Sequence, residues 1–202
     1  ITLHLSFIGF WSGATIGLFG ALGKTYGGPV TVKLINWYVI FFTNTPGLVT
    51  AFFIFFGLPE FGILLSPYHT ILLNIALNSG AYMTEIMRGG FVSVHKTELE
   101  AAETMGFTLL QQLRYVIVPH IAKVLFAPLS NWYIWMILGT AMAAIFGVEE
   151  LTGRVFNRAA ETFRSIELYT IAAGMYVAIT ILASSILVVI GRWAFRVKVK
   201  VF

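Results

Sequence analysis

Five long stretches of this sequence contain no charged residue, and they constrain the fold more than any other feature. All 13 Lys and Arg and all 9 Glu lie outside these stretches, and the chain has no Asp. Each stretch is 23 to 26 residues long, whereas a helix needs roughly 20 apolar residues to cross a bilayer core. The pattern predicts an all-α transmembrane protein with five spans, at about residues 1–23, 34–59, 61–84, 124–148 and 168–191.

The composition excludes several other classes of protein. Charged residues make up 11% of the chain, against roughly 25% in soluble domains, and without Cys there is no disulfide framework. In a membrane protein the basic excess reports orientation, so we expect no nucleic-acid partner. We find no repeat, linker or metal-ligand motif, and predict one membrane domain over residues 1–202 and no metal site. No basic leader precedes Ile1, so we predict no signal peptide and leave the true N-terminus open.

The distribution of Lys and Arg between the connectors predicts the orientation. Ten of these residues fall on one side of the membrane, and they are Lys24, Lys33, Arg88, Lys96, Arg114, Lys123, Arg192, Arg196, Lys198 and Lys200. Only Arg154, Arg158 and Arg164 fall on the other side. By the positive-inside rule the first side is cytoplasmic. The loop between spans three and four and the C-terminus are then inside, while the N-terminus and residues 149–167 are outside.

The first two spans contain signs of close packing and of a bend. Gly9, Gly13 and Gly17 recur every four residues, so they share one helical face and allow another helix to approach closely. In the second span, Thr43-Asn44-Thr45-Pro46 contains a proline that removes a backbone donor. We interpret this segment as a bend with a polar lining whose freed carbonyls need hydroxyl or water partners. A plain proline kink is the alternative.

Spans three and four contain polar residues that are candidates for a solute path. Asn74, Asn78 and Tyr82 lie along one stripe, which must face other helices or a water-filled path. Glu85 and Arg88 are three residues apart and are expected to form a structural ion pair at the membrane border. The candidate path residues are Asn44, Asn78, Tyr82, Asn131 and Thr140. The alternative for each is a hydrogen bond between helices.

The loop between spans three and four, about residues 89–120, has the features of a helix-glycine-helix element. Thr97-Glu98-Leu99-Glu100 is a capping-box pattern that starts a helix, and Gly106 stands where a left-handed helix stop is expected. Thr108-Leu109-Leu110-Gln111 is a second pattern of this kind, and Pro119 is expected to break the second helix before span four. Ala101 and Ala102 give a low-profile surface that suits a groove on a partner. An ordinary capped surface helix is the alternative.

The same loop resembles a known family motif. Glu100-Ala101-Ala102, Gly106 and Val116-Ile117-Val118-Pro119 resemble the EAA motif of type I ABC importer permease subunits, with Val116 and Val118 as mild departures. Phe55-Phe56-Gly57-Leu58-Pro59, the run from Asn78 to Gly90, and Gly147-Val148 with Glu150-Leu151 resemble the polar amino-acid branch of that family. The resemblance extends from about Thr45 to Thr152.

The resemblance implies a role for the loop and a set of partners. It implies a coupling helix that docks on a cytoplasmic ATPase through Glu100, Ala101, Ala102 and Gly106. The chain has no Gly-x4-Gly-Lys-Ser/Thr loop, so we expect no catalytic residues and no cofactor, with ATP and Mg bound by two partner ATPase subunits. A second permease chain, identical or related, and an external binding protein are the other expected partners. The implied location is the bacterial inner membrane.

Two departures from the branch bear on the solute. The branch usually has Arg-Gly-Thr-Pro where this chain has Thr43-Asn44-Thr45-Pro46, and Lys-Asp-Thr-Ser where it has Leu138-Gly139-Thr140-Ala141. Both departures remove charge. Charged contacts to an amino acid are therefore absent at these positions, and ligand contacts could come mainly from the second permease chain.

Other functions explain less of the sequence. The prediction is import of polar amino acids or close analogues, with another small solute as the alternative and a channel-like subunit as a more distant one. A channel gives no reason for the spacing of the loop motif. A secondary carrier would want ionisable residues near the midplane and an internal repeat. A membrane enzyme would need a nucleophile and a base, and His69 and His120 lie near opposite ends of their spans with no obvious partner.

Overall fold

The computed structural model describes residues 1–195, and these residues fold almost entirely into helices. The long elements are α1 (Thr2–Tyr26), α2 (Pro29–Asn44), α5 (Pro67–Val92), α8 (Val118–Gly139) and α10 (Ser165–Ile190). The short α-helices are α3 (Gly47–Phe52), α4 (Leu58–Glu60), α6 (Lys96–Thr104), α7 (Leu109–Gln112) and α9 (Leu151–Thr162). The π-helical segments are η1 (Phe53–Gly57), η2 (Leu113–Ile117) and η4 (Gly191–Phe195), and η3 (Thr140–Phe146) is a 3-10 helix.

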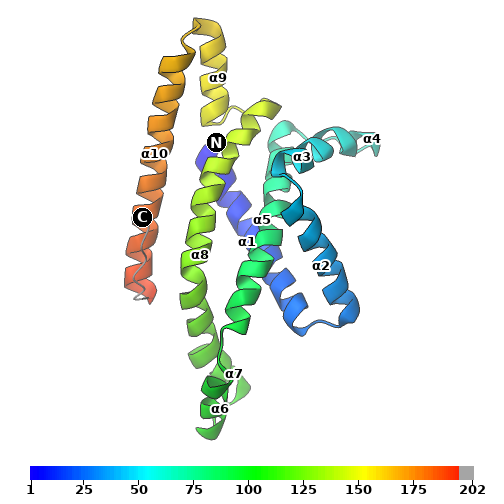
Figure 1. The fold of residues 1–202 in the computed structure, drawn as a ribbon, viewed down its shortest axis with the longest axis vertical. Helices are drawn as coiled ribbons and strands as arrows, with labels where there is room; N and C mark the ends of the chain where they lie inside the picture. Colours follow the sequence, from blue (N-terminus) through cyan, green and yellow to red (C-terminus); the bar gives the residue numbers. More distant parts are fainter. Residues whose placement is uncertain (196–202) are drawn as a thin grey trace.

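The long helices run up and down along the long axis of the molecule, and the connectors gather at its two ends (Figure 1). The α1–α2 turn, α6 and α7 lie at one end, and the N-terminus and α9 lie toward the other. This arrangement agrees with the predicted grouping of the connectors. Arg196, Lys198 and Lys200, which the orientation count included, lie outside the described residues.

Three helical stretches of the described chain are long and apolar enough to cross a membrane. They are Thr2–Tyr26, Leu109–Phe146 and Ser165–Phe195, and a bent pair, Pro29–Asn44 with Gly47–Glu60, would make a fourth. The predicted third span, which is now α5, is not among them; it contains the polar stripe together with Glu85 and Arg88. By length and hydropathy, the molecule is therefore a multi-pass helical membrane protein. The figure of five spans is still a prediction from the charge-free stretches.

The predicted windows are displaced from the helices, because the end of a charge-free stretch is not the end of a helix. Residues 61–66 are not helical, and α5 instead begins at Pro67, where the Ser66 side chain accepts from the backbone N–H of His69, and runs past Arg88 to Val92. Pro119 does not break the helix before span four. It lies in the first turn of α8, directly after the π-helical segment η2, and the helix continues through it.

The seam between α1 and α5 is the most extensive helix contact in the described part of the chain. As predicted, Gly9, Gly13 and Gly17 share one face, and all three are buried. A Cβ atom on any of them would lie 2.5 to 2.6 Å from an α5 side chain, with Gly9 opposite Ile75, Gly13 opposite Ser79 and Gly17 opposite Met83. Real Cβ atoms do not approach so closely, so only glycine allows the two helices to meet at this distance.

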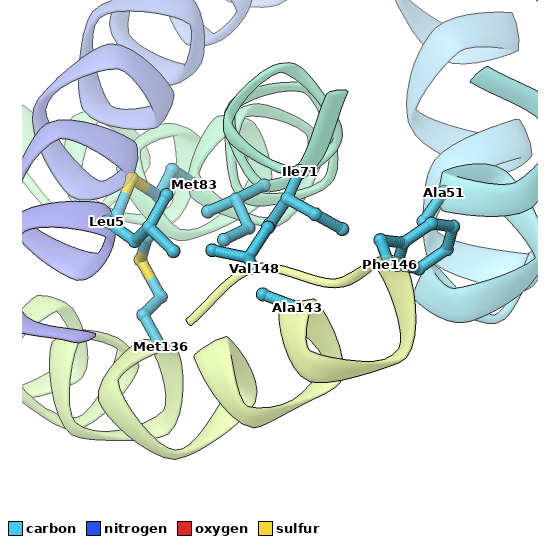
Figure 2. Packing of buried hydrophobic residues seen from close by; sticks show 9 residues of the cluster. Leu5, Ala51, Ile71, Met83, Met136, Ala143, Phe146 and Val148 are labelled. Carbon is cyan, nitrogen blue, oxygen red and sulfur yellow. The ribbon is translucent and has the colours of Figure 1, made fainter. Parts of the chain in front are cut away.

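The largest apolar cluster lies toward the outer end of this seam. Figure 2 shows residues of α1, α3, α5, α8 and η3 meeting in one group. Its buried members are Leu5, Ala51, Ile71, Ile75, Met83, Met136, Ala143, Phe146 and Val148. The cluster therefore connects α5 to α1, α3, α8 and η3. In contrast, α10 buries only Ala172 and Ser184 and packs against α8 and α9.

Candidate functional site

The second predicted span is broken where the sequence placed a polar bend. The helix stops at Asn44, restarts at Gly47 and changes direction by 106°, so that α3 and α4 extend sideways at the outer end of the molecule (Figure 1). Carbonyls near the break find side-chain partners on α5: the Tyr82 hydroxyl donates to Thr43 O at 3.2 Å and Asn74 Nδ2 donates to Gly47 O at 3.0 Å. The bend and its satisfied carbonyls confirm the interpretation made from the sequence.

The polar stripe on α5 is part of one hydrogen-bond network. Thr50 Oγ1 donates to Asn74 Oδ1 at 2.6 Å, and Asn78 Nδ2 lies 3.0 Å from both Thr50 Oγ1 and Asn74 Oδ1. Asn74 is 1% exposed. A polar group at this depth must be hydrogen-bonded to be tolerated. The stripe therefore serves first to hold the broken span against α5.

A cavity of about 560 Å³ opens beside this network, within the size range of small-molecule sites. The Tyr82 and Trp132 rings form one wall with centroids 4.6 Å apart. The lining contains amides, hydroxyls, aromatic rings and thioethers, and no Lys, Arg, Asp or Glu. It consists of Thr43, Asn44, Thr45, Pro46, Gly47, Asn74, Ile75, Asn78, Ser79, Tyr82, Trp132, Trp135, Met136, Gly139 and Met142.

The structure gathers three of the five predicted path residues at this cavity. Asn44, Asn78 and Tyr82 line it. Asn131 instead lies exposed on the surface of α8, and Thr140 is fully buried and donates to Ile137 O at 2.7 Å. Neither of these two residues lines the cavity.

Sequence reasoning missed the aromatic wall of the cavity. Trp132 and Trp135 lie in a charge-free window, where a tryptophan is equally typical of a lipid-facing surface. In the structure, their position opposite the polar stripe distinguishes these two tryptophans from lipid-facing ones. The spacing of Trp132 and Trp135 with Met136 on one face of the fourth span was the available signal.

At the end of the molecule that holds α6 and α7, the predicted helix-glycine-helix element is present. α6 ends at Thr104, and Gly106 follows with a φ of +77°, a conformation that glycine adopts without strain. The capping box at α7 is formed, because Thr108 N donates to Gln111 Oε1 at 2.8 Å and the Thr108 side chain accepts from Gln111 N. The prediction of a capping box at Thr97 is wrong. α6 begins at Lys96, and Thr97 lies inside the helix. The residue before the helix, His95, makes no side-chain cap.

Three of the four predicted docking residues are exposed on this element. Glu100, Ala101 and Gly106 are open, whereas Ala102 is 1% exposed and packs inside the chain. The sequence predicted that the two alanines share one outward surface. They do not, because only Ala101 is exposed. Because successive helical residues point about 100° apart, Ala101 faces out while Ala102 faces the rest of the element.

An exposed apolar surface accompanies these residues. Met105, Leu109 and Leu110 lie around the Gly106 turn, and the two leucines are 70% and 74% exposed. We call this set the apolar tip. Gln112, in contrast, is buried, and its side chain donates to Phe107 O.

Glu85 joins two helices beside this element. The predicted pair with Arg88 is formed, with Arg88 Nε 3.0 Å from Glu85 Oε2. Lys24 of α1 contacts the other Glu85 oxygen, which the sequence did not reveal because the two residues are far apart in the chain. The contact ties the inner ends of α1 and α5 together.

Glu150 plays a similar part at the outer end. It is 1% exposed and accepts from Thr2 Oγ1 at 3.2 Å, from Gly153 N at 2.9 Å and from the Tyr176 hydroxyl at 2.8 Å. One carboxylate therefore caps α9 and holds the start of α1 and the side of α10. The sequence placed Glu150 in the outer segment but did not indicate these three partners.

The histidines have partners that the sequence did not suggest. His69 Nδ1 lies 2.7 Å from Ser66 Oγ, and His120 lies beside Ser93 and Glu98. Within residues 1–195, no group of three or more His, Cys, Asp and Glu side chains could hold a metal ion.

Comparison with known proteins shows what the chain is similar to. Residues 6–198 match the family described as binding-protein-dependent transport system inner membrane component. The glutamine transport system permease protein GlnP of Escherichia coli is 34% identical over 189 residues, covering 93% of this chain and 86% of that protein. The L-cystine transport system permease protein TcyL of Bacillus subtilis is 29% identical over 207 residues, covering 99% of this chain and 83% of that protein.

A solved structure has the same fold. The crystal structure of an amino acid ABC transporter with histidines superposes with a TM-score of 0.87 at 32% identity, covering 95% of this chain and 89% of that chain. The agreement extends over nearly the whole length of both chains.

Proposed function

This chain belongs to the family of binding-protein-dependent transport system inner membrane components, it is the permease component of an amino-acid ABC importer, and we propose that it carries polar amino acids without net charge or close analogues. The chain is a transport component and not itself an enzyme. Its proposed location is the bacterial inner membrane, with the α6–α7 end in the cytoplasm.

The uncharged cavity is the observation that carries this substrate class. The lining offers amide and hydroxyl groups that can bind polar atoms, and aromatic rings that can pack on a side chain. A solute with a net charge would enter without a counter-ion, and an uncompensated charge in a low-dielectric site costs several kcal/mol. The missing charges at Thr43, Leu138 and Gly139 therefore favour solutes whose own charges cancel.

The coupling loop supplies the second half of the proposed function. Two ATPase subunits, which bind ATP and Mg, would each grip such a loop through the exposed Glu100, Ala101 and Gly106. The apolar tip at Leu109 and Leu110 gives that contact a hydrophobic centre, and protein interfaces draw most of their affinity from such buried centres. In this proposal Ala102 supports α6 from inside.

The remaining partners are assigned to two other surfaces. A second permease chain, identical or related, would cover the exposed side of α8, where Asn131 stands in an apolar environment that favours a polar partner on another helix. An external binding protein would approach the end that holds α9. Both partners are assigned to surfaces that the chain itself leaves exposed.

Equilibrium binding to the purified transporter tests the substrate class. The complex is prepared without its external binding protein, so that the membrane cavity alone is measured. Labelled glutamine should bind more tightly than labelled aspartate or arginine. In Thr43→Arg, the added cation should raise the affinity for aspartate by about tenfold relative to glutamine, which corresponds to about 1.4 kcal/mol.

Thr43→Met is the matched control, because it adds bulk at the same position without charge. It should leave the ratio of the aspartate and glutamine affinities unchanged. Equal binding of glutamine, aspartate and arginine by the unmodified transporter would contradict the proposed selection against net charge.

A further inference from the structure

His120 lies where three elements of the cytoplasmic end meet. It belongs to the first turn of α8, and its ring reaches both the residue that caps the end of α5 and the coupling helix α6. His120 Nε2 lies 3.2 Å from Ser93 Oγ, and Nδ1 lies 3.6 Å from Glu98 Oε2. Both ring nitrogens are therefore engaged, each by a different element.

The hydrogen bonds at Ser93 fix the direction of the first contact. The Ser93 hydroxyl donates its single proton to Gly90 O at 2.7 Å. Its oxygen can then only accept from the ring, so His120 Nε2 is the donor. This bond orients the imidazole and turns Nδ1 toward the Glu98 carboxylate, which is an ion pair when the ring is protonated.

The Glu98 contact is the direct polar link between α6 and the long helices. α6 packs on α7 and η2, and a short connection that contains Ser93 joins it to α5. At 3.6 Å the Glu98–His120 contact is an ion pair when the ring is protonated, and among the described residues α6 makes no other side-chain ion pair or hydrogen bond with another helix. A force on α6 reaches α8 by this link without first passing along the chain through α7.

We propose that His120 is a positioning residue that transmits the displacement of α6 to α5 and α8. The inference rests on the proposed docking of α6 to an ATPase subunit. When that subunit moves α6, Glu98 displaces the His120 ring, which carries the first turn of α8 and the Ser93 cap of α5 with it. Without the ring, α6 can move while the long helices lag behind, and ATP is hydrolysed without transport.

The test uses the complete transporter, with its ATPase subunits and binding protein, in proteoliposomes. Amino-acid uptake and ATP hydrolysis are measured in the same sample. For His120→Ala, uptake per ATP should fall by about fivefold or more, which is the usual lower size of coupling between sites. The substrate concentration for half-maximal uptake and the amount of ATPase subunit that co-purifies should not change, because neither depends on the proposed link.

A double-mutant cycle separates transmission from simple destabilisation. Glu98→Ala should lower uptake per ATP as much as His120→Ala, and the double variant should be no worse than either, since both remove one link. His120→Gln, whose amide can still donate to one of the two partners, should recover part of the coupling. His95→Ala removes an exposed histidine of the same loop and should leave the ratio at the unmodified value.

Three results would overturn the inference: an unchanged uptake per ATP in His120→Ala, independent and additive losses in the cycle, or no recovery in His120→Gln. If His120→Ala does not accumulate in the membrane, Glu98→Ala replaces it in the test. A lower uptake per ATP is expected for Glu98→Ala, and an unchanged uptake per ATP would overturn the inference. Failure of the unmodified chain to co-purify with ATPase subunits would instead refute the docking on which the inference rests.

Discussion

The α1–α5 seam and the α6–α7 element differ in how much of their surface the chain itself covers. In the seam, glycines bring two helices into contact, and the buried Thr84 hydroxyl donates to Gly80 O within α5. In the α6–α7 element, Met105, Leu109 and Leu110 remain exposed around a left-handed glycine. The chain itself covers the first region, whereas the second is the surface that we propose docks on another protein. Substitutions should therefore harm folding in the seam and harm assembly at the element.

The largest effect is expected at the seam. Gly13→Leu would place a side chain where even a Cβ atom lies 2.6 Å from Ser79 and 3.3 Å from the backbone nitrogen of Gly80. Overpacking typically costs about 1–3 kcal/mol, and we expect the upper end of this range or more here because the backbone must move. The folded protein should be lost from the monodisperse peak in detergent size-exclusion chromatography. Gly174→Leu is the control, because a Cβ atom there meets open space.

The next effect is expected at the apolar tip. Leu109→Glu should leave the melting temperature unchanged and weaken binding of the ATPase subunits by about 2 kcal/mol, or roughly 30-fold, if the tip is an interface centre. Co-purification at graded protein concentrations measures this. Gln111→Glu adds the same charge nearby while keeping a residue that can form the capping box, and it should bind normally. A lower melting temperature in Leu109→Glu would mean that the tip belongs to the fold instead.

A smaller effect is expected within the polar stripe. Asn74→Leu removes the donor to Gly47 O and one acceptor of the Thr50–Asn78 network, which leaves buried groups unpaired. The free energy of unfolding should drop by about 1–3 kcal/mol. Thermal unfolding in detergent is the measurement. Unaltered unfolding would show that the stripe does not hold the broken span.

The smallest effect is expected at the asparagine on the exposed face of α8. Asn131→Leu should change the stability of the single chain by less than about 0.5 kcal/mol. Pairing with the second permease chain should weaken by about 0.6 kcal/mol, the average for a polar contact between membrane helices. A monomer–dimer titration in detergent measures it. Tighter pairing of the leucine variant would indicate that Asn131 faces lipid.

Local sequence patterns were sufficient to predict the features that depend on residues close together in the chain. The glycine face of α1, the bend at Pro46, the helix stop at Gly106 and the Glu85–Arg88 pair depend on residues within one or two turns. The charge-free stretches located the long helices because a charge is costly in lipid wherever it stands.

The features that were missed depend on contacts across the fold. Ala102 is buried because α7 folds back over α6, and no spacing within α6 distinguishes it from Ala101. The role of Glu150 was not foreseen, because its partners Thr2 and Tyr176 are distant from it in the chain. The cavity likewise needs α2, α5 and α8 together, so a polar search found its amides and not its tryptophans.

The continuous helix from Leu109 to Phe146 has a mechanical consequence. Its 38 residues, at 1.5 Å each, make a rod about 57 Å long. One end follows the Gly106 turn, and the other holds Phe146 in the large apolar cluster. Pivoting such a rod by about 5° at its inner tip shifts its far tip by about 5 Å. A small tilt at one end of this helical stretch therefore becomes a shift of several ångströms at the other end, next to the outer apolar cluster.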